Sequence, residues 1–129
     1  MCRVVILHFA KRILQPGLIA LEMKGSIHSG PECARLEREV DSMIAVRETR
    51  VIFDMAGVTH ADSAAIGAIV RCVSKLKNAG GGLRIAAAQP MITYSLKLTK
   101  LDRLIEMFPS VDQAAQDFAP PGAGSGQRA

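Results

Sequence analysis

Short apolar runs alternate along this chain with segments in which apolar residues recur every three or four positions. Short runs bounded by turn residues predict β-strands. They cover residues 3–9, 18–23, 50–54 and 83–87. Gln15-Pro16-Gly17 separates the first two runs, which predicts an antiparallel hairpin or a loose two-stranded start. The run at 50–54 is nearly continuous, as expected for a strand that is covered on both faces.

Two longer segments show the spacing of amphipathic helices. The first opens at Ser29-Gly30-Pro31-Glu32, whose serine and glutamate match a capping box. The second begins at Asp62 or Ser63, because both are preferred N-cap residues, and runs to about Asn78. The glycines at 80–82 then end it. The predicted core-facing residues are Leu36, Val40, Met43, Ile44 and Val46 in the first helix and Ile66, Ile69, Val70, Val73 and Leu76 in the second.

The rest of the chain completes an α/β pattern. Residues 90–98 predict a helix, and residues 101–108 predict a short connection with an edge strand. Ser110 is expected to cap a final helix that runs through Phe118, and residues 119–129 to form a flexible tail. This order predicts one α/β domain over residues 1–118, with a mixed sheet of four to five strands and about four helices.

Composition narrows the classes of function. Hydrophobic residues make up 49% of the chain, which predicts a packed core, and no run approaches the ~20 residues that span a bilayer. We therefore expect no direct membrane insertion. Residues 1–14 contain charges and no small-residue cleavage site, so a secretory signal is not expected. Cys2, Cys33 and Cys72 lack metal-type spacing and cannot all pair, which favours a reducing, cytoplasmic compartment without a metal or other cofactor.

The net charge of +4 is unevenly placed. Between residues 63 and 103 the only carboxylate is Asp102, whereas the cations are Arg71, Lys75, Lys77, Arg84, Lys97, Lys100 and Arg103. This bias fits an acidic protein partner, a phosphate backbone or a solvated surface. Nucleic acid is disfavoured as a partner, because tryptophan is absent and no basic-aromatic interleaving occurs.

Residues 51–67 carry the main functional signal: a buried strand, a short turn and a serine at the start of an amphipathic helix. The helix dipole would stabilise a phosphate on that serine. With Asp54 ending the strand and Asp62-Ser63 opening the helix, the segment resembles the phosphorylation loop of the STAS domain family of anti-sigma factor antagonists. The family pattern is Asp-Ser-Ser-Gly-Leu-Gly, and its phosphorylated first serine corresponds to Ser63. Leu98-Thr99-Lys100-Leu101-Asp102-Arg103-Leu104 resembles a second family pattern, with Lys100 where glycine is usual.

The resemblance implies a binding protein that has no catalytic machinery of its own. The implied partner is a serine-kinase anti-sigma factor of the histidine-kinase-like ATPase fold. The unphosphorylated antagonist captures this kinase and frees the sigma factor, phosphorylation releases the kinase, and a PP2C-type phosphatase resets the system. Similar domains also serve as subunits of lipid-transport ATPases or as signalling scaffolds. A non-phosphorylated interaction module is therefore the alternative.

The predicted site extends from Ser63 along the second helix. Ala64, Gly67, Ala68, Arg71 and Lys75 lie three or four residues apart. They predict either an outward stripe that a partner approaches closely or, for the small residues, packing on the protein's own loops. Asp62 is expected to cap the helix or to position Ser63, and His60 to lie in the loop. Asp54 is expected to bond backbone N–H groups in that loop.

Two departures from the family pattern flank Ser63. Ala64 replaces the second serine, and Ala65 replaces a glycine, which demands a right-handed helical backbone there. Two other classes of function are disfavoured. A phosphoaspartate receiver needs acidic residues after its first strand, and residues 8–11 contain none. A Ser-His-Asp hydrolase lacks its Gly-x-Ser-x-Gly elbow here.

Overall fold

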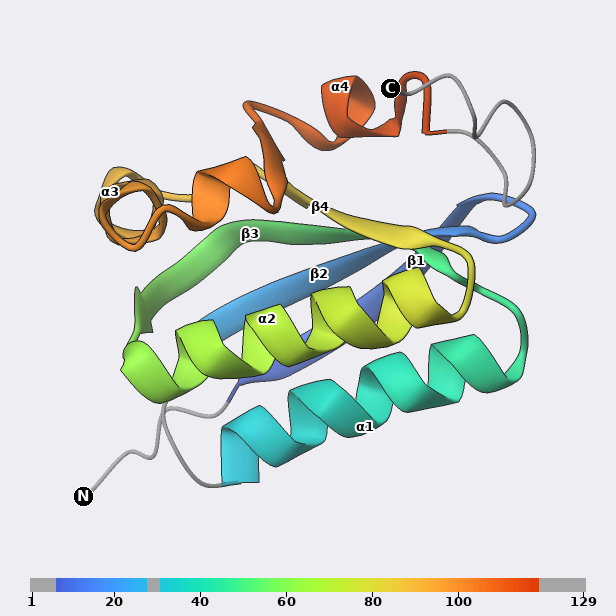
Figure 1. The fold of residues 1–129 in the computed structure, drawn as a ribbon, viewed down its shortest axis with the longest axis horizontal. Coiled ribbons are helices and arrows are strands. Elements are labelled where there is room, and N and C mark those ends of the chain that lie inside the picture. Colours follow the sequence, from blue (N-terminus) through green and yellow to red (C-terminus); the bar gives the residue numbers. More distant parts are fainter. Residues whose placement is uncertain (1–6, 28–30, 119–129) are drawn as a thin grey trace.

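The computed structural model describes residues 7–27 and 31–118 of the 129 (Figure 1). The predicted tail and the serine of the predicted capping box lie outside the described residues. In chain order the elements are β1 His8–Gln15, β2 Leu18–Ile27, α1 Pro31–Ala45, β3 Arg50–Ala61, α2 Ser63–Asn78, β4 Gly82–Ala86, α3 Pro90–Leu98, the 3-10 turn η1 Leu101–Arg103, β5 Glu106–Phe108 and α4 Val111–Ala115.

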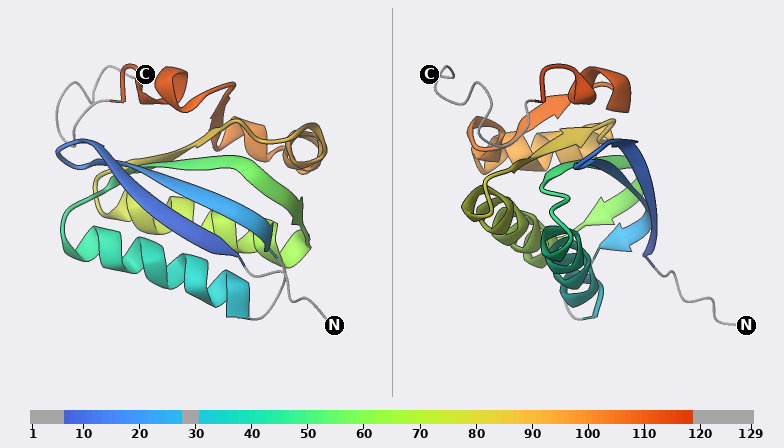
Figure 2. Two further views of the ribbon diagram at one scale, coloured as in Figure 1. Left: turned by 180° about the vertical axis from the view of Figure 1, so that it is seen from behind. Right: turned by 90° about the vertical axis from the view of Figure 1, so that its right-hand side faces the viewer.

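The five strands form one mixed sheet in the order β1-β2-β3-β4-β5. β1 and β2 pair antiparallel, and the remaining neighbours pair parallel. Helices α1 and α2 cover one face of the sheet, and α4 lies on the opposite face (Figures 1 and 2). Helix α3, seen end-on in Figure 1, lies beyond the C-terminal end of β4. The predicted α/β class, the mixed sheet and the hairpin are confirmed.

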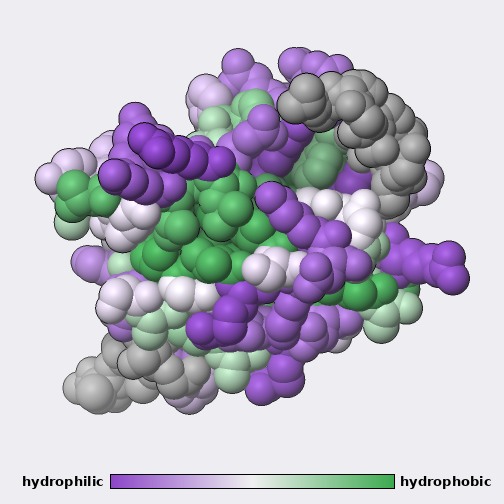
Figure 3. Space-filling view, in the orientation of Figure 1, coloured by the Kyte–Doolittle hydropathy of each residue, from purple (hydrophilic) through white to green (hydrophobic). Residues whose placement is uncertain are grey.

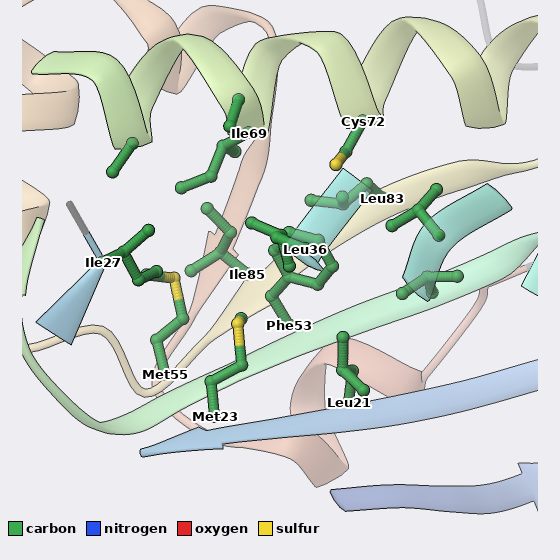
Figure 4. Packing of buried hydrophobic residues seen from close by; sticks show 14 of the residues in the cluster. Leu21, Met23, Ile27, Leu36, Phe53, Met55, Ile69, Cys72, Leu83 and Ile85 are labelled. Atoms are coloured by element: carbon green, nitrogen blue, oxygen red, sulfur yellow. The ribbon is translucent and has the colours of Figure 1, made fainter. Parts of the chain in front are cut away.

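The core has a layer on each face of the sheet. The larger layer contains strand residues such as Leu21, Phe53 and Ile85 and helix residues such as Leu36 and Ile69, all fully buried (Figure 4). The smaller layer consists of Leu18, Ile52, Ala86 and Ala114. Successive residues of β3 therefore point into different layers, which confirms the prediction that 50–54 is covered on both faces.

The helical stripes are largely as predicted. Of the predicted core-facing residues only Ile44 and Val70 are half-buried and Val46 exposed; the others are buried. Val46 is 61% exposed because α1 ends at Ala45. Val46 therefore lies outside the helix, and the helical spacing that predicted its burial does not apply to it. The chain then turns through Arg47, whose φ of +65° is incompatible with continuing the helix.

Three predicted strands end too early, since β2 also continues past the predicted residue 23 to Ile27. The first strand, β1, continues to Gln15 instead of ending at residue 9, and residues 3–6 of the predicted run lie outside the described residues. Strand β3 continues past Asp54 to Ala61, so the predicted turn does not exist. The pairing of β2 with β3 shifts register twice in this stretch, which indicates β-bulges. Bulges interrupt the alternation of apolar and polar residues, and that interruption looks like a turn in the sequence.

The two edges of the sheet differ in length. Strand β1 forms one edge and exposes six of its eight side chains, Lys11 and Arg12 among them. Strand β5 forms the other edge and has three residues. Neither edge offers a long, flat apolar strand.

Arg50 ties together segments that are distant in sequence. Its side chain is only 4% exposed, and its guanidinium donates to the backbone oxygens of Phe118 at 2.6 Å and Pro16 at 2.7 Å. The β1–β2 turn and the segment after α4 are thereby fixed to the start of β3. Helix α4 ends at Ala115 instead of Phe118, but its predicted cap is confirmed, since Ser110 Oγ accepts from Gln113 N at 3.2 Å.

Lys100 occupies a backbone conformation that favours glycine. Its φ is +63° and its ψ is +21°, in the left-handed region. A side chain in that region costs roughly 1–2 kcal/mol, which glycine avoids while losing some entropy on folding. Lys100→Gly is therefore expected to raise the free energy of unfolding by about 0.5–1 kcal/mol, measured by urea denaturation. The control is Lys97→Gly in the exposed face of α3, which should lower it by about 1 kcal/mol. Equal losses in both variants would contradict the argument.

Candidate functional site

Ser63 is the first residue of α2 and is exposed. Only Asp62 separates it from the end of β3. The backbone N–H of Asp62 donates to the backbone oxygen of Ile27 at 3.2 Å, which fixes the start of α2 to the end of β2. The Ser63 hydroxyl is thus presented from a firmly held backbone at the positive end of a 16-residue helix.

Asp62, not Ser63, is the N-cap of α2. Its backbone is extended, and its Oδ1 accepts from the N–H of Ala65 at 2.9 Å. Its carbonyl accepts the first helical hydrogen bond, from Ile66 N at 3.0 Å. Ala65 is buried and helical, as predicted from its side chain, and Ala64 is half-buried against the core. The capping role left open by the sequence therefore belongs to Asp62, and Ser63 stands at the N1 position.

Removal of this cap should weaken the domain measurably. Asp62→Ala deletes the acceptor for Ala65 N–H and is expected to lower the free energy of unfolding by about 1 kcal/mol in urea denaturation. Asp62→Asn keeps an acceptor oxygen, so its loss should stay below about 0.5 kcal/mol. A loss in the asparagine variant as large as in the alanine variant would show that the hydrogen bond is not what stabilises the helix start.

Asp54 lies within β3 and not at its end. Its Oδ1 accepts from the N–H of Ala56 at 3.2 Å, so it does bond a backbone N–H, at the first bulge instead of in a loop. The carbonyl of Ala56 in turn accepts from Gln89 Nε2 at 2.9 Å. This contact connects β3 to the residue that precedes α3.

His60 also lies in β3, which corrects its predicted placement in a loop. Its Nδ1 is 3.1 Å from Thr59 Oγ1, which donates to Gly25 O at 3.3 Å and approaches the buried Ser26 hydroxyl. Beside this network is a pocket of about 190 Å³ between the end of β3 and α3. It is lined by Thr59, His60, Ala61, Asp62, Met91, Ile92 and Ser95.

The sequence alone does not reveal this pocket, because its two walls are about thirty residues apart along the chain. The sequence does contain one indication of this surface, in the spacing of apolar residues in segment 90–98. Met91, Tyr94 and Leu98 follow helical spacing, and so do Ile92 and Leu96. Segment 90–98 is therefore apolar on two sides, whereas one side suffices to pack a surface helix.

The predicted outward stripe on α2 is only partly correct. Ala68 is fully buried, so it does not face outward. Arg71 is exposed, but it bonds Glu37 of α1 at 2.9 Å, and Lys75 pairs with Asp41 at 3.1 Å. The hydrogen bond from Arg71 lowers the pKa of the Glu37 carboxyl. Of the stripe, Ala64 and Gly67 remain as half-buried small residues next to Ser63.

The cysteines within the described residues are structural. Cys33 and Cys72 are both buried, and burial raises the pKa of the Cys72 thiol to about 12. A thiol with such a pKa stays protonated and is a poor nucleophile near neutral pH. In the described part of the chain no group of three potential ligands is placed to hold a metal ion, and no helix there is long and apolar enough to cross a membrane.

The fold and the site define a small α/β domain in which a mixed sheet presents an exposed serine at a capped helix start. The STAS domain family matches residues 14–114, and the chain belongs to this family. A search of curated proteins by sequence finds no match.

Solved structures share the fold at low sequence identity. An anti-sigma factor antagonist from Mycobacterium paratuberculosis is 19% identical with a TM-score of 0.74, covering 84% of this chain and 91% of its own. The phosphorylated form of the Bacillus cell fate determinant SpoIIAA is 13% identical with a TM-score of 0.66, and the match covers 83% of this chain and 96% of the SpoIIAA chain. A sulfate transporter family protein from Wolinella succinogenes is 15% identical with a TM-score of 0.64, and the match covers 80% of this chain and 85% of the transporter family protein.

Proposed function

We propose that this protein is an anti-sigma factor antagonist that binds a serine-kinase anti-sigma factor and is switched off by phosphorylation of Ser63. The observation that carries the proposal is the exposed Ser63 hydroxyl at the first position of a capped helix. The fold it shares with anti-sigma factor antagonists supports the same function. In this proposal the domain is a non-catalytic, cytoplasmic binding partner.

Phosphorylation would act on binding more than on the fold. It adds about −1.5 to −2 charges and three acceptor oxygens, and the positive end of α2 tolerates them. The carboxylate of Asp62 stands next to the new charge, so the helix start becomes strongly anionic. A partner surface that is acidic or apolar opposite Ser63 is then repelled or left with an uncompensated charge. A PP2C-type phosphatase would restore the binding form.

The partner surface proposed on α2 is smaller than the sequence predicted. Asp62, Ala64 and Gly67 surround Ser63 and can be approached closely. Arg71 and Lys75 already pair with Glu37 and Asp41 of α1, so a partner's carboxylates would compete with these two for the cations. Such competing ion pairs contribute little at an exposed surface.

Gly67 offers a direct test of close approach. A Cβ at this position would meet only Arg71 Nη1 at 3.6 Å, an ordinary contact. Gly67→Ala should therefore stabilise α2 by about 0.5–1 kcal/mol in urea denaturation while weakening binding to the kinase. Ser74→Ala, at an exposed position of the same helix, is the control that should leave binding unchanged. Binding of the Gly67→Ala variant as tight as wild type would contradict close approach at this position.

Intact mass spectrometry of the protein purified from its own host tests the proposal. We expect a fraction with one added phosphate that is absent in Ser63→Ala and retained in Ser74→Ala. A protein that is unmodified under all growth conditions would contradict it. The second candidate, a non-phosphorylated interaction module of a lipid-transport system or a signalling complex, would then be preferred. The helical, buried Ala65 near Ser63 favours that candidate, and a sulfate transporter family protein shares the fold.

A further inference from the structure

Exposed large apolar side chains gather on one segment of the molecule. Within the described residues, four of the six such side chains lie between positions 91 and 104, and the other two are Ile13 and Val46. Met91 is 74% exposed, Tyr94 64%, Leu98 63% and Leu104 42%. Figure 3 shows hydrophobic surface gathered between α2 and the segment of α3 and η1. Single exposed apolar residues are ordinary, whereas a cluster of them marks an interaction surface.

Three of these residues form a stripe along α3. Met91, Tyr94 and Leu98 are spaced by three and four residues, so they share one side of the helix. Ile92 and Leu96, which are buried, hold α3 to the domain from another side. The stripe is therefore not required for the fold of α3.

The stripe is continuous with the surroundings of Ser63. Met91 lines the pocket of about 190 Å³ together with Asp62, the residue that caps α2. The stripe and the pocket thus make one surface that begins beside the phosphorylatable hydroxyl. Tyrosine and methionine are both enriched in protein interfaces, and tyrosine is among the residues that often dominate the binding energy.

The charges around the stripe specify the partner's chemistry. Lys97, Lys100 and Arg103 are exposed in the same segment, against one carboxylate, that of Asp102. Among the described residues none of these three cations forms an ion pair, in contrast to Arg71 and Lys75 on α2. A second copy of this chain would bring like charges together, whereas an acidic surface would complement them.

We propose that the partner of the Ser63 site seats on the α3 stripe, with an apolar groove receiving Met91, Tyr94 and Leu98 and an acidic rim facing Lys97 and Lys100. This inference rests on the proposed function and names the second half of its binding surface. The phosphate on Ser63 would then enter an interface whose partner side is already acidic. That arrangement explains how one modification separates the two proteins.

The test uses as probes the serine kinases of histidine-kinase-like ATPase fold encoded in the source genome, each purified and titrated against the unphosphorylated full chain by calorimetry. Tyr94→Ser and Met91→Ser should each raise the Kd of the kinase that binds by about tenfold or more. Ile13→Ser and Val46→Ser are matched controls, because these side chains are 64% and 61% exposed elsewhere on the molecule. They should leave the Kd within about twofold. The double variant Lys97→Glu/Lys100→Glu should also weaken binding, and the loss of affinity should be larger at low salt than at high salt.

The outcomes separate the inference from the function it rests on. A kinase that binds wild type and the two α3 serine variants equally would overturn the α3 surface and leave the proposed function standing. Unchanged binding of the double glutamate variant would overturn the acidic rim. A panel in which no kinase binds wild type would overturn both. A wild-type dimer that Tyr94→Ser converts to monomer in sedimentation would replace the acidic partner with a second copy of the chain.

Discussion

Replacement of Gly81 by alanine is expected to lower the free energy of unfolding by about 3 kcal/mol or more, a fall in Tm of roughly 10 °C. A Cβ at Gly81 would lie 1.9 Å from the backbone oxygen of Thr49 and 2.5 Å from its carbonyl carbon. Backbone atoms cannot rotate away as a side chain does. The chain would have to separate the end of α2 from the start of β3.

The surrounding hydrogen bonds explain why the two segments stand so close. Gly81 N donates to Leu76 O at 2.9 Å and Gly80 N to Lys77 O at 3.0 Å, with Gly80 at a φ of +90°. This is a Schellman ending of α2. Gly82 N then donates to Thr49 O at 2.9 Å, which brings the chain into register with β3. The three consecutive glycines therefore end a helix, pass another backbone and begin β4.

Gly82→Ala is the matched control for Gly81→Ala. A Cβ at Gly82 would meet only ring atoms of Phe118, at 3.7 and 3.8 Å, which is ordinary van der Waals contact. The expected change in the free energy of unfolding is within about 0.5 kcal/mol. Thermal and urea denaturation of the two variants measure the difference, and equal losses would contradict the steric explanation.

Substitution of Arg84 by alanine is the second large expected loss, about 2–4 kcal/mol in urea denaturation. The Arg84 guanidinium donates to the carbonyls of Ala114 at 2.9 Å and Gln116 at 2.8 Å. It also lies 5.2 Å from the ring centre of Phe108 and 4.4 Å from that of Phe118. Without it the segment that follows β5 loses its attachment to β4. Hydrogen exchange of amides 111–118 should accelerate more than exchange in α2.

Two further variants identify which contacts of Arg84 matter. Arg84→Lys keeps the charge and loses the planar fork, so we expect it to lose most of the stability as well. Glu106→Gln removes only the ion pair between Arg84 and Glu106. Because the Glu106 side chain is 68% exposed, this variant should lower the free energy of unfolding by less than about 0.5 kcal/mol. A cost for Glu106→Gln equal to that of Arg84→Ala would show that the ion pair, and not the clamp on the C-terminal segment, carries the effect.

Local patterns were sufficient for the fold class and for the position of Ser63. Helix α2 has a continuous apolar stripe and clear start and stop signals, and its predicted bounds agree with the structure. Strand β3 was predicted too short, because bulges near Gly57 and Thr59 break the alternation that identifies a strand. Val46 was placed in the core because spacing alone does not show where a helix ends.

The predicted outward stripe on α2 differs from the structure where it depended on tertiary contacts. Arg71 and Lys75 look like free cations in the sequence, yet their partners on α1 lie 34 residues away, a separation that no local pattern reports. The burial of Ala68 follows from how α2 is rotated against the sheet. The stripe on α3 was visible as spacing, but only the structure shows that it continues into a pocket beside Asp62.

The edges of the sheet bear on how much of this protein a cell can hold. In the proposed function this protein captures its partner stoichiometrically, so it would have to be at least as abundant as the protein it removes. Abundant sheet proteins risk joining edge to edge, because an exposed strand is a template for another. Here one edge carries Lys11 and Arg12 and the other offers three residues of strand. Both edges therefore disfavour pairing with another copy, which suits the abundance that the proposed capture of a partner would require.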